Sequence, residues 1–175
     1  MKRKSQKKMW RDRRKAGLLL FVSIIVLVIV ELFRKEAAPD RFGPYPVERV
    51  VDGDTFIASI DGKSEKIRLI GVDAPESVHP DQRRNTAEGE EVSKYVRSLL
   101  ENKRVYLEYD VSITDQYDRV LAYVYLEDGN TMLNELLLEE GYAAVMTVQP
   151  NSRYADHFYE VQRKAREEKK GIWEK

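Results

Sequence analysis

An uncharged, apolar run near the N-terminus constrains the fold of this chain more than any other feature. Residues 16–30 contain no charged side chain, and the run extends to residue 33 if Glu31 reaches a membrane interface. This stretch is too long for a core strand and shows no amphipathic period, so it predicts one transmembrane helix over 16–33. The rest of the 175 residues is left to form one ordinary domain.

Charge is distributed very unevenly around this run. Nine of the first fifteen residues are Lys or Arg, and only Asp12 is acidic. Such a block predicts a basic cytoplasmic tail over 1–15 and an extracytoplasmic domain held at the cell membrane by a signal-anchor. The alternative is a secreted protein released by signal-peptide cleavage, although Ala38 is followed by Pro39 and offers a poor cleavage site.

The composition of the remaining chain excludes several classes of site. Residues 37–175 carry 19 basic and 27 acidic side chains, so bulk positive charge cannot draw this domain to a polyanion. The absence of Cys excludes a disulfide framework, a thiolate zinc site and a cysteine nucleophile. The two His are too few for a histidine-rich transition-metal site.

The pattern of short apolar runs predicts a barrel. Residues 34–46 hold three of the six prolines and are expected to be a linker before a domain over 47–175. Two β-rich runs are joined by Asp61 and Gly62, a strong hairpin signal. The expected elements are strands over 47–51, 54–60, 66–72, 104–109 and 119–126, and helices over 88–102, 132–140 and from Asn151 or Ser152 to about 170. This order favours a five-stranded, partly open Greek-key barrel of the OB type with three α-helices.

Five side chains at the ends of these runs suit phosphodiester chemistry. Asp54 and Asp73 are hard oxygen ligands, which, with a backbone carbonyl and waters, suit Ca²⁺ better than a soft metal. Glu76 is a carboxylate able to orient or deprotonate a water molecule. Arg68 and Arg119 offer planar guanidinium groups to a phosphate whose charge rises in the transition state. Each residue alone also fits a turn, a surface charge or a structural ion pair.

Taken together, these motifs resemble the staphylococcal nuclease-like, or thermonuclease, family. The resemblance covers about residues 47–173 and rests on the segments 51–55, 68–76, 114–119, 121–125 and 171–173. It implies an OB-fold barrel with three helices. It also implies a Ca²⁺-dependent nuclease that acts on DNA and RNA, cleaves the 5′ P–O bond and leaves 3′-phosphate ends.

The resemblance also implies a role for individual residues. The expected catalytic side chains are Arg68, Glu76 and Arg119. The expected calcium ligands are Asp54, Asp73 and the main-chain carbonyl of Ala74. The expected substrate contacts are Tyr117 and, in a polar loop, Arg83 and Arg84. Two positions depart from the family pattern, because Asp118 stands where Gly is common and Met146 lies near the place of a second nucleotide-contacting tyrosine.

Two functions other than catalysis are compatible with an OB barrel. The first is a membrane-anchored module that binds single-stranded nucleic acid without cutting it, and the second is a structural or adhesion domain. A binding module is expected to lack some of the five side chains that suit hydrolysis, and a structural domain leaves the two arginines unexplained. The sequence therefore favours a monomeric nuclease with no protein partner.

Overall fold

The computed structural model describes residues 40–77 and 85–174, and residues Pro39–Lys175 form one compact unit. The expected cytoplasmic tail, the helix expected over 16–33, and Arg83 and Arg84 lie outside the described residues. Within residues 40–77 and 85–174, no helix is both long and apolar enough to cross a bilayer. The anchor and the contacts of the polar loop therefore stay predictions.

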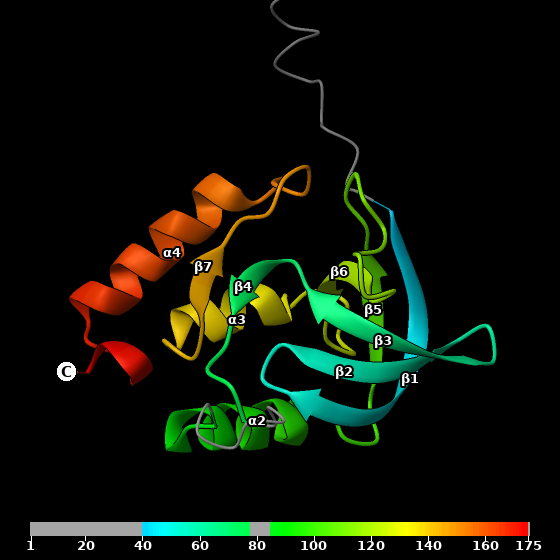
Figure 1. Cartoon of the computed structure of the whole chain (residues 1–175), viewed down its shortest axis with the longest axis horizontal. Helices are drawn as coiled ribbons and strands as arrows, with labels where there is room; N and C mark the ends of the chain where they lie inside the picture. Colours follow the sequence, from blue (N-terminus) through cyan, green and yellow to red (C-terminus); the bar gives the residue numbers. More distant parts are fainter. Residues whose placement is uncertain (1–39, 78–84, 175) are drawn as a thin grey trace, which may run out of the picture. The chain divides into compact units, whose positions relative to one another are not determined.

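Five strands close into a barrel (Figure 1). Around the barrel they follow the order β1 (Arg41–Asp52), β2 (Thr55–Ile60), β3 (Lys63–Leu69), β6 (Val120–Tyr125) and β5 (Arg104–Glu108). Neighbouring strands are antiparallel except for β3 and β6, which pair in parallel. The barrel confirms the five-stranded OB-type architecture expected from the sequence, but it is closed and not partly open as expected.

The hairpin between β2 and β3 lies where the sequence predicts it. Asp61 and Gly62 form a two-residue loop with φ of 51° and 80°, and the strands pair from Ile60 and Lys63 inward. Two consecutive positive φ values match the right-handed twist of the strands, and Asp and Gly tolerate them well.

The first strand begins earlier than expected. Residues 41–46, assigned to the linker over 34–46, are instead part of β1 and pair with β5, with Arg41 opposite Glu108. The pairing is irregular between Phe42 and Tyr45, where Gly43 has φ of 128° and Pro44 has no N–H to donate. A strand that accommodates proline at an irregularity looks like a linker in sequence, which explains the wrong boundary.

A sharp bend divides the third β-rich run into two strands. The strand expected over 66–72 ends at Leu69, and β4 (Gly71–Asp73) leaves the barrel to pair with β7 (Ala144–Met146). Gly71 permits the bend with φ of 80°. The buried side chain of Asn134 stabilises it by donating to Ile70 O at 2.8 Å and accepting from Val124 N at 2.9 Å.

Three α-helices cover the barrel in the described part of the chain, as expected. They are α2 (Ala87–Leu100), α3 (Leu133–Glu139) and α4 (Ala155–Glu167), and a short 3₁₀ helix, η2 (Gly171–Trp173), follows them. The hydroxyl of Thr86 caps α2 by accepting from Gly89 N at 2.9 Å. Figure 1 shows α2 below the barrel, and α3 and α4 beside β4 and β7.

The last helix starts later than the sequence suggests. Neither Asn151 nor Ser152 caps it, because its N-cap position is Tyr154. The side chain of Asn151 is instead buried and exchanges two hydrogen bonds of 2.8 Å with the backbone of Ser112. This contact joins the loop after β5 to the loop before α4.

Candidate active site

One cavity brings together the side chains in which the sequence predicts hydrolytic chemistry. The cavity has a volume of about 340 Å³ and opens where β1, β3 and β4 end and β2 begins. Its lining includes all six residues expected to bind calcium or to take part in catalysis, namely Asp54, Arg68, Asp73, Ala74, Glu76 and Arg119. The fold therefore places residues up to 65 positions apart in the sequence around one space.

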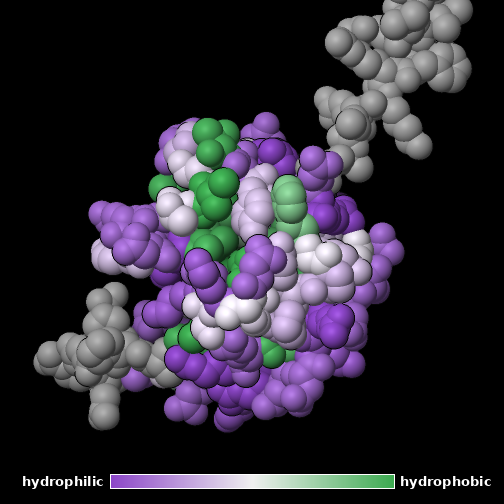
Figure 2. Space-filling view, turned by 90° about the vertical axis from the view of Figure 1, so that its right-hand side faces the viewer, coloured by the Kyte–Doolittle hydropathy of each residue, from purple (hydrophilic) through white to green (hydrophobic). Residues whose placement is uncertain are grey.

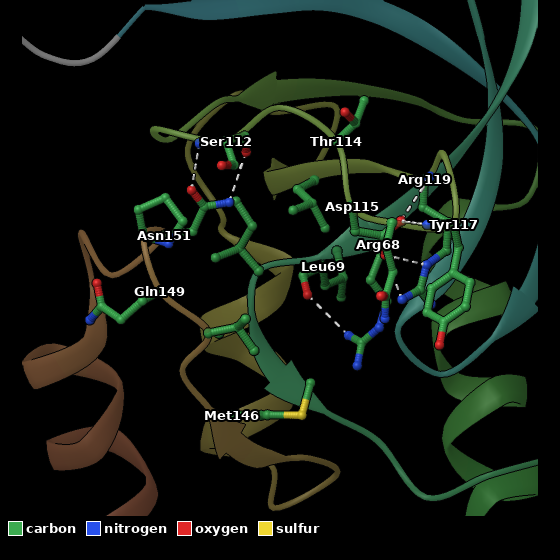
Figure 3. A pocket seen from close by; sticks show the side chains of 16 residues that line it. Arg68, Leu69, Ser112, Thr114, Asp115, Tyr117, Arg119, Met146, Gln149 and Asn151 are labelled. Atoms are coloured by element: carbon green, nitrogen blue, oxygen red, sulfur yellow. Dashed lines mark hydrogen bonds and ion pairs between the residues drawn. The ribbon is translucent and has the colours of Figure 1, made fainter.

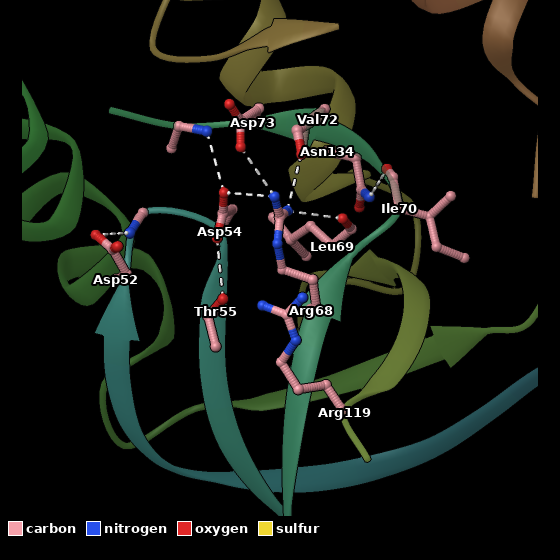
Figure 4. Close-up of polar contacts among 12 residues, drawn as sticks. Asp52, Asp54, Thr55, Arg68, Leu69, Ile70, Val72, Asp73, Arg119 and Asn134 are labelled. Carbon is pink, nitrogen blue, oxygen red and sulfur yellow. Dashed lines mark hydrogen bonds and ion pairs between the residues drawn. The ribbon is translucent and has the colours of Figure 1, made fainter. Parts of the chain in front are cut away.

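Asp54 is fixed in the turn between β1 and β2. Its carboxylate is buried and accepts hydrogen bonds from Thr55 Oγ1 at 2.9 Å and from the backbone N–H of Ala74 at 3.1 Å (Figure 4). Burial raises the pKa of this carboxyl, and the adjacent guanidinium of Arg68 opposes that rise. A buried carboxylate of this kind is stabilised by a cation beside it.

Arg68 bridges the two carboxylates expected to bind metal. Its terminal nitrogen NH2 lies 3.0 Å from Asp54 Oδ2 and 3.1 Å from Asp73 Oδ1. The other terminal nitrogen donates to the carbonyls of Leu69 at 3.0 Å and Val72 at 2.8 Å, as Figure 4 shows. The guanidinium thus binds the backbone carbonyls at the bend between β3 and β4, and it holds the carboxylates of Asp54 and Asp73 close together.

Arg119 reaches the same cavity through the parallel pairing of β3 with β6. Arg68 is the register partner of Leu121, so the residue just before β6 lies beside β3. Figure 4 shows the guanidinium of Arg119 directed toward that of Arg68. Asp115 Oδ2 accepts a hydrogen bond from Arg119 Nε at 2.7 Å and forms an ion pair with NH2 at 2.7 Å, and this pairing fixes the guanidinium in the loop.

Sequence reasoning missed Asp115, which organises the turn ahead of β6. Its Oδ1 accepts from the backbone N–H of Tyr117 at 2.9 Å and of Arg119 at 3.0 Å. Although burial acts to raise it, these hydrogen bonds and those from the Arg119 side chain lower the pKa of Asp115. The sequence signal that could have indicated this role is an acidic residue four positions before an arginine in a predicted turn.

The backbone of Glu76 is held tightly beside the start of α2. Its carbonyl accepts from Thr86 N at 2.9 Å, which brings together the two ends of the segment 77–85. The next residue, Ser77, donates through Oγ to Asp52 Oδ1 at 2.5 Å, and Ser93 Oγ on α2 reaches the same oxygen at 3.1 Å. These long-range bonds, which no local sequence pattern predicts, set the position of the Glu76 main chain.

Gly89 is the position where this arrangement is most sensitive to added volume. A Cβ atom there would lie 2.3 Å from the carbonyl oxygen of Glu76, so Gly89→Ala is expected to displace the Glu76 backbone. A misplacement of about 1 Å costs about 10²-fold in rate. Steady-state cleavage assays with thermal unfolding as a control measure this effect, and Lys94→Ala on the exposed face of α2 is the matched variant. Unchanged kcat in a folded Gly89→Ala protein would contradict the close approach.

A second cavity of about 380 Å³ adjoins the first and shares Arg68 and Arg119 with it. Figure 3 shows Tyr117, Met146, Gln149 and the Ser112–Asn151 pair around this space. The ring of Tyr117 is exposed, and the Arg119 guanidinium lies 5.4 Å from its centroid. The cavity therefore offers apolar and aromatic walls, Met146 among them, next to two guanidinium groups.

Asp118 adopts a left-handed backbone conformation with φ of 57°. Its N–H donates to Asp115 O at 3.2 Å and closes the turn that carries Tyr117. This conformation accounts for the glycine that is common at this place, since Gly adopts positive φ without a steric cost and Asp is among the residues that tolerate it.

Comparison with known proteins agrees with this geometry. Residues 66–175 match the family described as Staphylococcal nuclease homologue. The chain is 39% identical over 168 residues to a thermonuclease of Staphylococcus hyicus, which covers 90% of this chain and 95% of the relative. It is also 39% identical over 166 residues to a thermonuclease of Staphylococcus intermedius, with the same coverage.

A more distant relative shares the same region of the chain. The endonuclease YncB of Bacillus subtilis is 37% identical over 131 residues, which correspond to 74% of this chain and 61% of the relative. The family match, the extent of the similarity to the two thermonucleases and the closed barrel all agree. The chain therefore belongs to the staphylococcal nuclease family.

Proposed function

We propose that this chain is a calcium-dependent nuclease that hydrolyses phosphodiester bonds of DNA and RNA and leaves 3′-phosphate ends. Its relatives include two thermonucleases and an endonuclease, which supports a nuclease function. The observation that carries the proposal is the single cavity lined by two arginines and four carboxylates, those of Asp52, Asp54, Asp73 and Glu76. A phosphodiester in such a cavity lies beside two arginines that can stabilise its negative charge and beside a carboxylate that can act as a base.

The donor set at the cavity fits a hard cation. Asp54 Oδ2 and Asp73 Oδ1 converge on one nitrogen of Arg68, so two carboxylate oxygens already face a shared positive charge. No group of three or more His, Cys, Asp or Glu side chains that could hold a metal occurs among residues 40–77 and 85–174. A site of two carboxylates completed by the Ala74 carbonyl and waters suits Ca²⁺, which accepts flexible oxygen coordination.

The hydrolysis can be assigned to groups of the chain. Calcium, when bound, supplies positive charge that orients the phosphate. Glu76 takes a proton from the attacking water as the oxygen of that water bonds to phosphorus and the bond to the 5′ oxygen breaks. The departing 5′ oxygen takes up a proton from solvent water and leaves as a 5′-hydroxyl. Arg68 and Arg119 donate hydrogen bonds to phosphate oxygens whose negative charge grows in the transition state. Tyr117 provides a face on which a base stacks in the adjoining cavity.

Calcium dependence is tested by removing the ion and by removing one ligand. Cleavage of a short single-stranded DNA is expected to fall to background in chelator and to return with Ca²⁺. Asp73→Asn is expected to weaken calcium binding by about tenfold or more, because a lost unit charge at ligand distance costs about 1–4 kcal/mol. Calorimetry measures the affinity.

The calcium experiment has a matched control in Asp61→Asn. Asp61 lies at the exposed hairpin tip with a left-handed backbone that Asn also adopts, so this variant changes the same charge away from the cavity. Equal calcium affinity in both variants, or full activity in Mg²⁺ with calcium chelated, would contradict the proposal.

The proposal includes attachment to the membrane through residues 16–33, with the barrel on the extracytoplasmic side. It is supported by the apolar run and by the nine Lys and Arg residues before it. The same features are compatible with secretion after cleavage, in which case the barrel would be released. The cavity can form in either the anchored or the released protein, because every residue that lines it lies beyond residue 50.

A further inference from the structure

Hydrophobic side chains gather at the end of the barrel where β1 begins. In Figure 1 the start of β1, the loop after β5 and the loop before α4 all lie at the top of the view. Figure 2, which shares its vertical axis, shows hydrophobic surface in the upper half of the face displayed. Four apolar side chains on these segments are exposed, namely Phe42 at 45%, Val111 at 72%, Ile113 at 54% and Val148 at 61%. We refer to these four residues as the apolar edge.

Contacts made by Phe42 and by residues near the other three members hold the apolar edge together. The ring of Phe42 lies 5.3 Å from that of Tyr109, two residues before Val111. The two hydrogen bonds between Ser112 and Asn151 hold the loop of Val111 and Ile113 against the loop of Val148. The edge is therefore a fixed surface and not three unrelated loop tips.

Exposed charge is sparse beside Val111, Ile113 and Val148, whereas Phe42 follows the exposed Arg41. Residues 111–114 and 141–152 contain no charged side chain, whereas charged residues make up 34% of the sequence. The acid next to Val111, Asp110, has a side chain only 6% exposed and accepts from Tyr123 OH and Arg153 N at 3.1 Å, while Asp115, Asp118 and Arg119 follow later in the same loop. The guanidinium of Arg153 is itself paired with the buried Glu108 at 2.7 Å. Apolar tips whose neighbouring charges are paired within the domain suit a lipid surface better than a polyanion, which needs available cations.

The short distance in sequence between the apolar run and β1 indicates which surface the apolar edge contacts. Six residues lie between Phe33, the end of the apolar run, and Asp40, and the seven Cα-to-Cα steps between these two residues span at most about 25 Å. β1 starts one residue later, with Arg41 and Phe42 paired to the strand that leads into Val111. We propose that the apolar edge rests on the bilayer that holds residues 16–33 and so fixes the orientation of the nuclease domain at the membrane. This inference depends on the proposed anchor.

Single-cysteine labelling of the full chain in vesicles tests the inference. The chain has no Cys, so each variant carries one environment-sensitive fluorophore at a known place. The labelled variants are Leu27→Cys in the apolar run, Val111→Cys and Ile113→Cys on the edge, and Ser98→Cys on the exposed face of α2. Vesicles of phosphatidylcholine and phosphatidylglycerol with spin-labelled lipid quench probes that reach the bilayer. Probes at 27, 111 and 113 should lose most of their fluorescence, and the probe at 98 should keep it.

Each other outcome overturns the inference in a recognisable way. Quenching at 27 with probes at 111 and 113 as bright as that at 98 would leave the anchor intact and remove the docking surface. No quenching at 27 would remove the anchor and the docking together. A response of the probe at 111 to single-stranded DNA, with calcium chelated and lipid absent, would assign the edge to nucleic acid instead.

A charge-insertion variant provides an independent readout. Val111→Asp with Ile113→Asp, made in the Val148→Cys background, should abolish lipid quenching of the probe at 148. Val148 lines the second cavity but Val111 and Ile113 line neither, so circular dichroism and cleavage of a short soluble DNA should match those of the Val148→Cys parent. Undiminished quenching in the folded double variant would overturn the inference.

Discussion

Replacing Arg119 by Ala is expected to lower kcat about 10²–10³-fold, which is the usual cost of removing a preorganised donor to a developing negative charge. The guanidinium is positioned before substrate arrives, because Asp115 holds both Nε and NH2 at 2.7 Å. Its interaction with phosphate strengthens as charge grows, so the loss should fall mainly on kcat and less on KM.

Two companion variants make the Arg119 result interpretable. Arg119→Lys should recover little activity, because an ammonium group cannot replace the planar fork. Arg97→Ala removes an exposed arginine from α2 and should behave as the native protein does. Steady-state kinetics on a short single-stranded DNA provides the measurement, and near-native kcat for folded Arg119→Ala would remove this arginine from the transition state.

Glu76→Gln is expected to reduce kcat about 10²–10⁴-fold, the range attributed to a positioned general base. The amide keeps the shape of the side chain but cannot accept the proton of water. The main chain of Glu76 is held by Thr86 N and, through Ser77, by Asp52, so the variant should retain its fold.

The control for Glu76→Gln is Glu90→Gln, the same change at an exposed site in the first turn of α2. Substrate affinity, measured with calcium present and a non-cleavable phosphorothioate DNA, should change little in both variants. If Glu76→Gln loses binding as severely as turnover, the residue acts on substrate placement and not as a base.

Features fixed by neighbouring residues were predictable from the sequence. The hairpin at Asp61 and Gly62 follows from two positions that accept positive φ. The amphipathic helix α2 follows from the spacing of Val92, Val96 and Leu100, which are all buried. In the candidate site, the motifs predicted the six residues that the structure gathers into one cavity, although their roles stay predictions.

Features fixed by distant partners were not predictable. Pro44 and Pro46 made the start of β1 look like a linker, and only its pairing with β5 shows otherwise. Asn151 resembled a helix cap, but its side chain bonds to Ser112, 39 positions away. The bond from Ser77 to Asp52 likewise spans 25 positions. Such contacts depend on the closed barrel, which no local pattern encodes.

The parallel pairing of β3 with β6 has a consequence for the timing of activity. It joins Ile67 to Val120, 53 positions later, so it is a non-local contact whose loop must close before the strands stabilise each other. Arg68 and Arg119 come from the two sides of this pair. An unfolded chain therefore does not hold Arg68 and Arg119 together, so the candidate site exists only after the barrel has closed.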